Sequence, residues 1–446
     1  MEADLILKGG TLICMDPQRS VRQADLVISG GRIAAVESAT RQKARRVLDV
    51  TGAVVLPGFV QCRTRLGLTF FRRPEEPASP NRRQRLAGLE AAHDRASAFS
   101  AAALGVAELL RGGTTCVLDM GDGAQAEMLF QAADGMGLRG AFGKALADRG
   151  EEGLPRALYG TAEAQLKDVE FLCRRWHNAD GGRLRCAVSL RGLMWSSRLL
   201  LNGAAQTARG QGLLLTVGVA PDREAMRELS ERYGVEPLRY LLDSGFVGPD
   251  TALGQCDVCR VEDLPLLVRS GGSICHCPGE TIVCGEGRVS LPEMLSAGVN
   301  VALGCQDPLW NPDLDMFTLM RRAIELQETR EGGPATLSPR AVLEMATLGG
   351  ARALGMASEI GSLMPGRKAD ITVLRLEGAA TLTPEALIAQ VVRTATAEQV
   401  SHTLVGGRVL LEEGRLVDVD WEGLVVEAAR EAAALRRRAD GQGAEA

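Results

Sequence analysis

The sequence predicts an α/β fold: a TIM (β/α)8 barrel with a small composite β-sandwich domain formed by both chain ends. Three observations support this prediction. The chain has 446 residues, more than one hydrophobic core usually organises. Short apolar runs alternate with helical stretches along its middle, as in parallel βα units. Both ends carry an apolar run, a Gly-Gly pair and a second apolar run, which is typical of tight β-hairpins.

Eight apolar runs account for the predicted barrel strands. They are Val54–Cys62, Thr114–Met120, Arg139–Leu146, Leu184–Leu190, Leu213–Val219, Thr251–Cys256, Ser273–Cys277 and Asn300–Cys305. Helical stretches such as Ser97–Leu110, Asp222–Leu242 and Asp313–Glu328 fall between or after them. Eight strand–helix units match a TIM barrel with insertions. A doubly wound open sheet is the alternative, but no Gly-x-Gly-x-x-Gly turn follows the first strand.

The Gly-Gly pairs predict three hairpins at the chain ends. They run from Leu5 to Ile13 with a turn at Gly9-Gly10, from Leu26 to Val36 with a turn at Gly30-Gly31, and from Thr403 to Leu411 with a turn at Gly406-Gly407. Two hairpins are N-terminal and one is C-terminal, so we expect one β-domain built from residues 1–56 and 359–420. The barrel then spans 57–358, and 421–446 form a surface helix and tail.

The composition is that of an ordinary folded protein, with 46% apolar and 24% charged residues. A net charge of −5 does not attract nucleic acid or acidic lipid, so we expect neither as a partner. No apolar run approaches the ~20 residues of a membrane helix and no leader pattern opens the chain, so we expect a cytoplasmic protein. Eleven cysteines without a short secreted framework indicate reduced thiols.

Several motifs, in the right order, resemble the amidohydrolase superfamily. Residues 56–66 (LPGFVQCRTRL) resemble its first barrel strand, and 107–115 (AELLRGGTT) the passage into the second. Residues 274–278 (ICHCP) resemble the seventh strand, and 361–370 (GSLMPGRKAD) the return into the composite β-domain. The branch most similar to this chain comprises amino-hydrolases acting on cytosine, guanine, adenosyl compounds and triazines. The resemblance implies a barrel enzyme that hydrolyses non-peptide C–N bonds.

The resemblance also implies a metal site, and here the sequence departs from the family. Members bind Zn²⁺ or Fe²⁺ through a His-x-His pair on strand one, a His on strand six and an Asp on strand eight, often with a His on strand five. The corresponding residues in this chain are Arg63, Arg65, Gln255, Gln306 and Gly218. Arginine is permanently cationic and has no lone pair to donate to a metal. We therefore expect no metal cofactor, with Zn or Fe only under the alternative below.

Arg63 and Arg65 stand at i and i+2, so both guanidinium groups are expected in the former metal pocket. An unpaired buried charge costs several kcal/mol, so some partner must be present. An internal carboxylate such as Asp307 or Asp119 is the favoured partner. A small anionic ligand is the alternative, since forked donors suit phosphate or carboxylate.

His276 is the one catalytic-type histidine left, and we interpret it as a packed or hydrogen-bonded remnant. His276 and Asp307 are the catalytic candidates only if the chain is active. A thiolate metal site is a further alternative, resting on four cysteines near the barrel mouth. They are Cys62, Cys256, Cys277 and Cys305. Their spacing fits no standard zinc finger or ribbon, and cysteine is a common buried residue.

These observations predict a pseudoenzyme: an amidohydrolase fold that has lost its metal site and acts as a non-catalytic binding, assembly or regulatory subunit. We expect a homo-oligomer or a protein partner, such as an active homologue. One alternative is an active metal-dependent amidohydrolase or deaminase-like hydrolase with a rebuilt site. The other is an anion-binding sensor that uses the arginine-lined barrel mouth.

Overall fold

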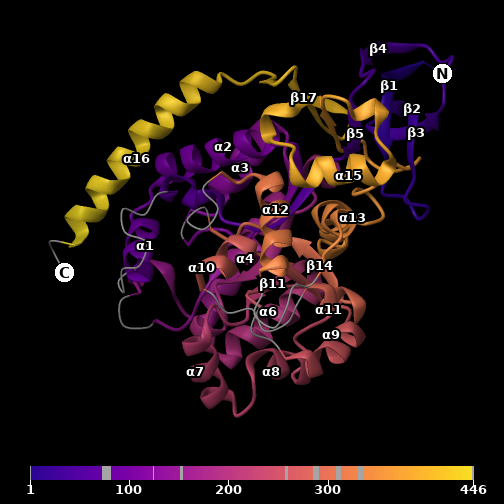
Figure 1. The fold of residues 1–446 in the computed structure, drawn as a ribbon. Helices are drawn as coiled ribbons and strands as arrows, with labels where there is room; N and C mark the ends of the chain where they lie inside the picture. Colours follow the sequence, from indigo (N-terminus) through magenta and orange to yellow (C-terminus); the bar gives the residue numbers. More distant parts are fainter. Residues whose placement is uncertain are drawn as a thin grey trace.

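Two β-sheets organise the computed structural model, which describes residues 2–72, 82–123, 125–150, 154–256, 260–284, 291–307, 313–329 and 336–443. One sheet comes from the two chain ends, and the other forms a barrel between them. Figure 1 shows the indigo N-terminal strands beside the orange and yellow C-terminal ones, with the barrel below both. The chain ends therefore build one unit, as the hairpin pattern predicts.

The end sheet has nine hydrogen-bonded strands, in the order β18-β17-β16-β15-β5-β1-β2-β3, with β4 paired to β1. Its strands are β1 (Ala3–Ile13), β2 (Val21–Ser29), β3 (Arg32–Glu37), β4 (Ala44–Asp49), β5 (Val54–Pro57), β15 (Ile371–Leu374), β16 (Val400–Val405), β17 (Arg408–Glu412) and β18 (Arg415–Leu416). Strand β15 pairs antiparallel with β5, which joins the C-terminal strands to the N-terminal ones.

Two of the three predicted hairpins are confirmed, at Gly30-Gly31 between β2 and β3 and at Gly406-Gly407 between β16 and β17. The hairpin at Gly9-Gly10 is wrong, because Leu5 to Ile13 belongs to the single strand β1. The register of β1 shifts between Leu7 and Gly10, and Gly9 has a φ of +77° there. The glycine pair forms a bulge, and the strand continues because β2, β4 and β5 all pair with it.

The barrel strands run parallel in the order β14-β13-β12-β11-β10-β8-β7-β6, with the short β9 paired to β10. Their bounds are β6 (Phe59–Thr64), β7 (Thr114–Asp119), β8 (Arg139–Phe142), β9 (Ala145–Leu146), β10 (Leu184–Leu190), β11 (Leu214–Gly218), β12 (Thr251–Gly254), β13 (Ser273–His276) and β14 (Asn300–Leu303). The Gln306 N–H donates to the Arg63 carbonyl at 2.9 Å, so the two outer strands meet and the barrel is nearly closed. The predicted α/β barrel is confirmed.

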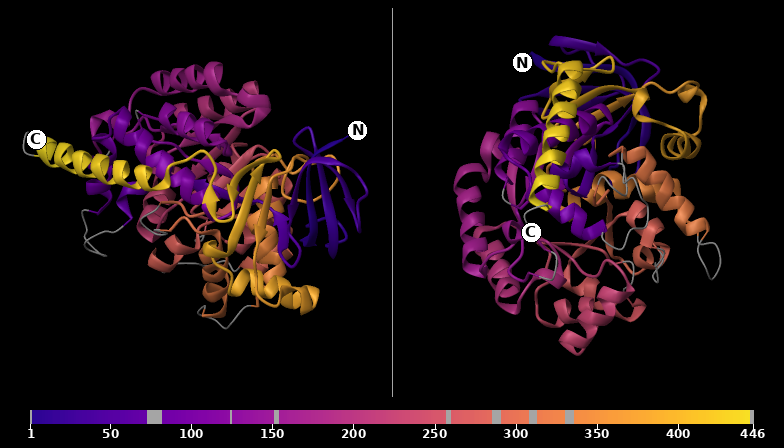
Figure 2. Two further views of the ribbon diagram at one scale, coloured as in Figure 1. Left: turned by 90° about the horizontal axis from the view of Figure 1, so that it is seen from above. Right: turned by 90° about the vertical axis from the view of Figure 1, so that its left-hand side faces the viewer.

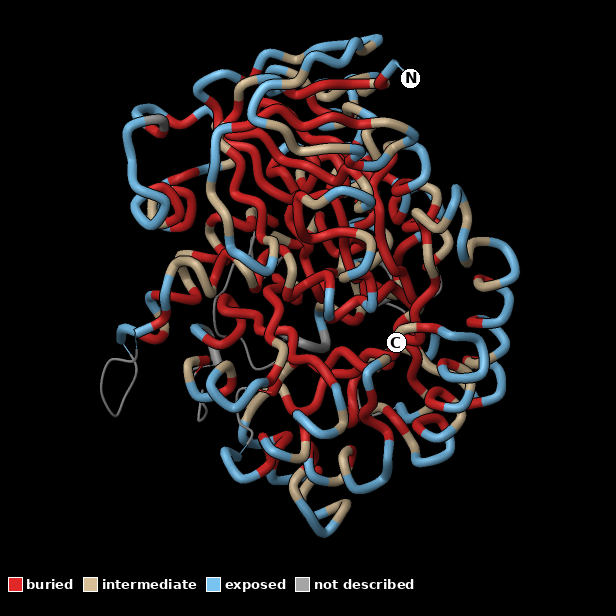
Figure 3. Tube along the Cα trace, turned by 90° about the vertical axis from the view of Figure 1, so that its right-hand side faces the viewer, coloured by how far each residue is buried: buried red, intermediate tan, exposed pale blue. Residues whose placement is uncertain are grey.

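Helices lie around the barrel and beside the end sheet, and buried residues fill the interior while exposed residues lie on the outside (Figure 3). They are α1 (Arg82–Ala91), α2 (Arg95–Arg111), α3 (Glu127–Met136), α4 (Ala162–Trp176), α5 (Ala179–Gly182), α6 (Arg198–Gln211), α7 (Arg223–Tyr233), α8 (Pro237–Asp243), α9 (Leu264–Ser270), α10 (Pro278–Cys284), α11 (Leu291–Ser296), α12 (Met316–Glu328), α13 (Pro339–Glu344), α14 (Gly350–Ala353), α15 (Pro384–Arg393) and α16 (Trp421–Gly443). Across the described part of the chain, every helix is too short or too polar to span a membrane.

The C-terminal helix α16 leaves the end sheet and runs along the outside of the barrel (Figure 2). It packs beside α2, and its Leu435 is buried in a small cluster with Leu68 and Phe71. Arg438 pairs with Asp94 at 3.1 Å, at the start of α2. The predicted surface helix is therefore anchored to the barrel along its length.

Candidate functional site

Arg63 lies at the carboxyl end of β6, where a TIM barrel carries its active site. The register between β6 and β7 shifts between Cys62 and Thr64, so Arg63 is the extra residue of a bulge. Its φ is +70°, a left-handed conformation that a side chain with a Cβ rarely adopts. Bulges next to active sites re-aim a side chain, and here the bulge directs a guanidinium into the barrel.

The Arg63 side chain crosses the barrel interior and is only 1% exposed. Its Nε donates to the Gln306 Oε1, and its Nη1 donates to the Thr216 Oγ1 at 3.4 Å. Thr216 belongs to β11, on the far side of the barrel from β6. Nη2 has no hydrogen-bond acceptor, and none of the described carboxylates forms an ion pair with Arg63. Arg63 therefore lacks the expected carboxylate partner among the residues that the structure describes.

Two glycines make room for this guanidinium. A Cβ on Gly254 would lie 2.1 Å from the Arg63 Nε. A Cβ on Gly218 would lie 2.2 Å from the Gln255 Oε1 and 2.8 Å from the Arg63 Nη2. The structure thus brings four of the predicted pocket residues, Arg63, Gly218, Gln255 and Gln306, into one packed group.

The backbone of this group is strained at three positions. Arg63, Gln255 and Gln306 have φ values of +70°, +57° and +65°, and they follow or end β6, β12 and β14. A non-glycine residue in this region costs of order 1–3 kcal/mol and persists only where the surroundings hold it. All three are buried or half-buried at the same end of the barrel.

Arg65 lies just beyond the end of β6 and enters a different network. Its Nη2 donates to the Glu90 Oε2 at 2.7 Å, and its Nη1 lies 3.5 Å from the Asp307 Oδ1. Arg191 contacts both oxygens of Glu90, with distances of 2.9 Å and 2.5 Å. Burial acts to raise the pKa of Glu90, but Arg191 and Arg65 together hold it well below its usual range. The two arginines of the sequence motif therefore have unlike partners.

Two further carboxyls lie next to this network, at the end of β7. Asp119 accepts hydrogen bonds from the Leu66 and Gly121 N–H groups, both at 2.7 Å, and burial raises its pKa to about 6. Asp122 is 2% exposed, and neither of its oxygens has a hydrogen-bond partner. Burial and the negative charge of Glu90 raise the pKa of Asp122 to about 8, so this carboxyl is largely protonated at neutral pH.

His276 ends β13 and is buried, next to the helix α10 that begins at Pro278. Glu280 of that helix accepts a hydrogen bond from the Gln255 Nε2 at 2.7 Å. Asp307 follows β14, the neighbouring strand, and faces Arg65. The carboxyl ends of the barrel strands therefore carry a histidine, several carboxyls and the buried guanidinium of Arg63.

The residues at these positions do not fit a divalent metal. The Arg63 guanidinium, which has no lone pair for a metal, occupies the middle of the group, and Gly218 has no side chain that could ligate one. No group of three or more His, Cys, Asp or Glu side chains suited to a metal occurs among the described residues. Cys62, Cys277 and Cys305 are buried, and burial raises the pKa of each thiol well above its usual value. Cys256 is buried as well.

Comparison with known proteins decides the family. The model of the amidohydrolase family matches residues 54–410. The chain belongs to this family. A protein of Syntrophobacter fumaroxidans named 5-methylthioadenosine/S-adenosylhomocysteine deaminase is 31% identical over 94% of this chain and 95% of its own. A 5'-deoxyadenosine deaminase of Methanosarcina acetivorans is 28% identical over 98% of this chain and 100% of its own.

Among solved structures, an adenosine deaminase from Xanthomonas campestris with bound zinc superposes with a TM-score of 0.89. It is 24% identical, and the match covers 98% of this chain and 99% of that one. This likeness concerns the fold. The zinc belongs to that protein, so the absence of a metal cofactor that we expected for the present amidohydrolase is not confirmed.

The expectation of a pseudoenzyme is wrong by these comparisons. Relatives that are 28–31% identical along nearly the whole chain are named as deaminases. This chain has unusual residues at the family's metal-ligand positions, but those residues alone do not show that the protein is catalytically inactive. The expected oligomer or protein partner stays a prediction.

The sequence alone did not indicate Glu90, Asp122, Arg191 or Glu280 as parts of the site. Glu90 lies 25 residues after Arg65 and 101 residues before Arg191 in the chain. Pairing over such distances is decided by the tertiary fold. The only available signal was position, since Asp122 and Arg191 each follow a predicted strand, where barrel enzymes place functional residues.

Proposed function

We propose that this amidohydrolase removes an amino group from an adenosyl-type nitrogen heterocycle by hydrolysis, through a rebuilt site at the barrel mouth. The observation that carries the proposal is the strained backbone at Arg63, Gln255 and Gln306. Backbone strain of this kind clusters at active sites, where the surroundings hold a required geometry. The substrate class follows from the names of the deaminase relatives.

Hydrolytic deamination adds water to the ring carbon that carries the amino group and then breaks the C–N bond. One proton leaves the water, and one proton reaches the departing ammonia. His276 ends β13 and Asp307 follows the neighbouring strand β14, and we assign them these two transfers. Arg65 holds the Asp307 carboxylate in place from 3.5 Å.

Arg63 supplies a fixed positive charge in the middle of this group. In a buried site a charge acts far more strongly than in water, and it stabilises negative charge that develops on the substrate ring. Gln306 and Thr216 hold the guanidinium by hydrogen bonds. The role assigned to Arg63 is therefore electrostatic, without proton transfer, because arginine stays protonated.

The test is ammonia release from 5'-methylthioadenosine, S-adenosylhomocysteine and 5'-deoxyadenosine. The protein is purified without a chelating tag, its metal content is measured, and each substrate is assayed with and without added Zn²⁺ or Fe²⁺. We expect turnover that falls by about 10²–10⁴-fold in Asp307→Asn and in His276→Gln, as for the loss of a general acid or base.

The matched control is Asp243→Asn, an exposed carboxylate that pairs with Arg239 on α8. This variant should retain full turnover. Absence of ammonia release from all three substrates and from a panel of amino-substituted heterocycles, by folded protein in both metal conditions, would contradict the proposal. Equal activity of Asp307→Asn and Asp243→Asn would contradict the assigned residues.

A further inference from the structure

A polar cavity lies at the opposite end of the barrel from the site described above. It has a volume of about 300 Å³, at the lower end of the range of small-molecule pockets. Arg139 begins β8 and Arg183 immediately precedes β10, so this wall is formed by the amino ends of barrel strands. Active sites of TIM barrels lie at the carboxyl ends, so this cavity is separate from the site at the barrel mouth.

The opposite wall comes from the end sheet. The Gly30-Gly31 turn of β2–β3 and Gly406 of the β16–β17 turn line it. The Ala369 N–H donates to the Gly31 carbonyl at 3.0 Å, and the Gly407 N–H donates to the Ala369 carbonyl at 2.9 Å. Hydrogen bonds thus join the segments of this wall, which come from both chain ends, and only the folded whole forms the cavity.

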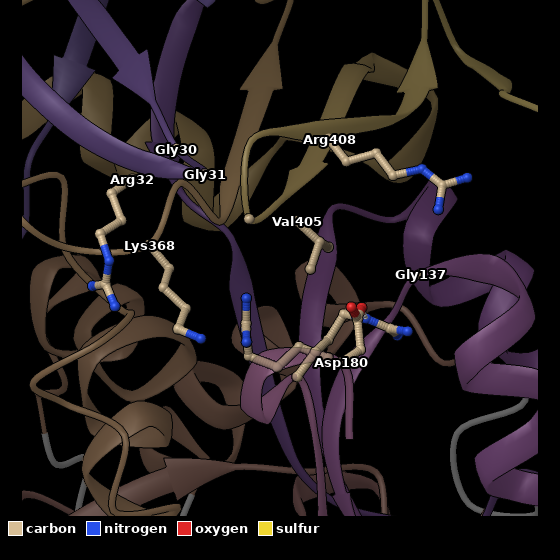
Figure 4. Close-up of a pocket in the computed structure, with 11 residues that line it drawn as sticks. Gly30, Gly31, Arg32, Gly137, Asp180, Lys368, Val405 and Arg408 are labelled. Carbon is tan, nitrogen blue, oxygen red and sulfur yellow. Dashed lines mark hydrogen bonds and ion pairs between the residues drawn. The ribbon is translucent and has the colours of Figure 1, made fainter. Parts of the chain in front are cut away.

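The charges that face the cavity are mostly positive. Five cationic residues and one carboxylate line it: Arg32, Arg139, Arg183, Lys368, Arg408 and Asp180. Figure 4 shows Arg32 and Lys368 on one side, Arg408 and Gly137 on the other, and Asp180 below. Because the cations come from separate segments, they surround the space and do not form a single exposed strip.

Carboxylates behind the wall neutralise part of this charge. Asp370 accepts from the Nε and Nη2 of Arg139 at 2.6 Å and 3.0 Å, Asp134 binds Arg183 at 2.7 Å, and Glu359 lies 3.5 Å from the Lys368 Nζ. Asp418 lies 3.7 Å from Arg408. These partners hold the cations in place but occupy only some of their donors.

Unused donors remain at the cavity. Arg139 is 3% exposed, and its Nη1 has no hydrogen-bond partner. Arg32 donates from Nη1 to the Gly366 carbonyl, and no ion pair forms between Arg32 and the described carboxylates. A buried donor without an acceptor destabilises the folded protein, and a bound acceptor would offset that cost.

We propose that this cavity binds a phosphate group, either free phosphate or the end of a small phosphomonoester, through Arg32, Arg139 and Lys368. A phosphate offers several acceptor oxygens and two negative charges, which matches a cavity lined by cations from separate elements better than a single carboxylate does. The ligand bridges the end sheet and the barrel. Its binding goes beyond the proposed deamination and does not depend on it.

Calorimetric titration with inorganic phosphate tests the proposal, with chloride keeping the ionic strength constant. The variant is Arg32→Gln combined with Lys368→Gln, which spares the buried Arg139–Asp370 pair. The matched control is Arg375→Gln, an exposed cation of the same region that pairs with Glu413 outside the cavity. We expect saturable binding by the wild type and the control, and binding at least about tenfold weaker in the double variant.

Glycerol phosphate and adenosine 5'-monophosphate form the second arm of the experiment. Binding of these esters without binding of inorganic phosphate, and its weakening in the double variant, would assign the site to a phosphomonoester. Equal phosphate affinity in wild type and double variant would overturn the proposal, as would absence of saturable binding of all three probes. Since the readout is binding heat, a failed deamination assay leaves this result unaffected.

Discussion

Replacing each of the two motif arginines by methionine should change the free energy of unfolding by very different amounts. Arg65→Met removes a guanidinium that pairs with Glu90 at 2.7 Å and lies 3.5 Å from Asp307, while Glu90 keeps Arg191. Breaking a buried pair by removing one partner costs about 3–5 kcal/mol. Because one partner of Glu90 remains, we expect Arg65→Met to lose about 3 kcal/mol, the low end of that range.

Arg63→Met removes a buried cation that has no ion pair with a described carboxylate. Burying the Arg63 guanidinium costs several kcal/mol of desolvation free energy that no opposite charge offsets. The methionine variant avoids this cost. Against this gain, the Gln306 Oε1 loses its donor, at about 1–3 kcal/mol. We therefore expect a net change between zero and a gain of about 2 kcal/mol.

Differential scanning calorimetry and urea unfolding of the two variants beside the wild type measure the difference. The substitutions have the same side-chain chemistry and lie two residues apart, so each serves as the control for the other. If Arg63→Met loses as much stability as Arg65→Met, the reasoning is refuted, because Arg63 would then have a compensating partner in the folded protein.

Three other measurements check the same physical argument. Glu90→Gln should lose about 3–5 kcal/mol because two guanidinium groups lose their shared charge. The exposed control Glu163→Gln should leave the melting temperature unchanged, so thermal unfolding distinguishes the two variants. Burial raises the pKa of Asp122 from 3.8 to about 8, so the folded state binds this proton more tightly than the unfolded state does. The free energy of unfolding should therefore fall as the pH rises from about 4 to about 8. Melting temperatures measured across this pH range should lack that fall in Asp122→Asn. Dialysis against a chelator should leave deamination unchanged, because the Arg63 guanidinium and the side chains of Gln255 and Gln306 stand where the family's metal ligands would be; loss of turnover that Zn²⁺ restores would contradict this.

The barrel was predictable because its signal is local and repeated. Each strand is a short apolar run between helical stretches, and all eight runs occur as barrel strands in the structure. The first run, Val54–Cys62, is divided between β5 of the end sheet and β6 of the barrel. Nothing in its hydrophobicity marks that division, because both parts are fully buried.

The β-bulges could not be predicted from the pattern of apolar residues and glycines. The Gly9-Gly10 pair has the composition of a hairpin turn but forms a bulge within β1. Alternation along a regular strand predicted that Arg63 and Arg65 share a face, but the bulge at Arg63 interrupts the alternation. Whether a glycine pair turns or bulges, and whether a strand stays regular, depends on which neighbouring strands pair with it.

The energetics of the barrel mouth argue that its unusual residues are retained for function. The buried guanidinium of Arg63 and the left-handed backbone of Arg63, Gln255 and Gln306 all raise the free energy of the folded state. An apolar side chain at 63 would remove the uncompensated charge. A site under no functional constraint has no reason to keep these costs together at one end of the barrel, because selection for stability alone would not favour them. Their coincidence at the carboxyl ends of β6, β12 and β14 is the arrangement expected of a working site whose chemistry requires a fixed positive charge.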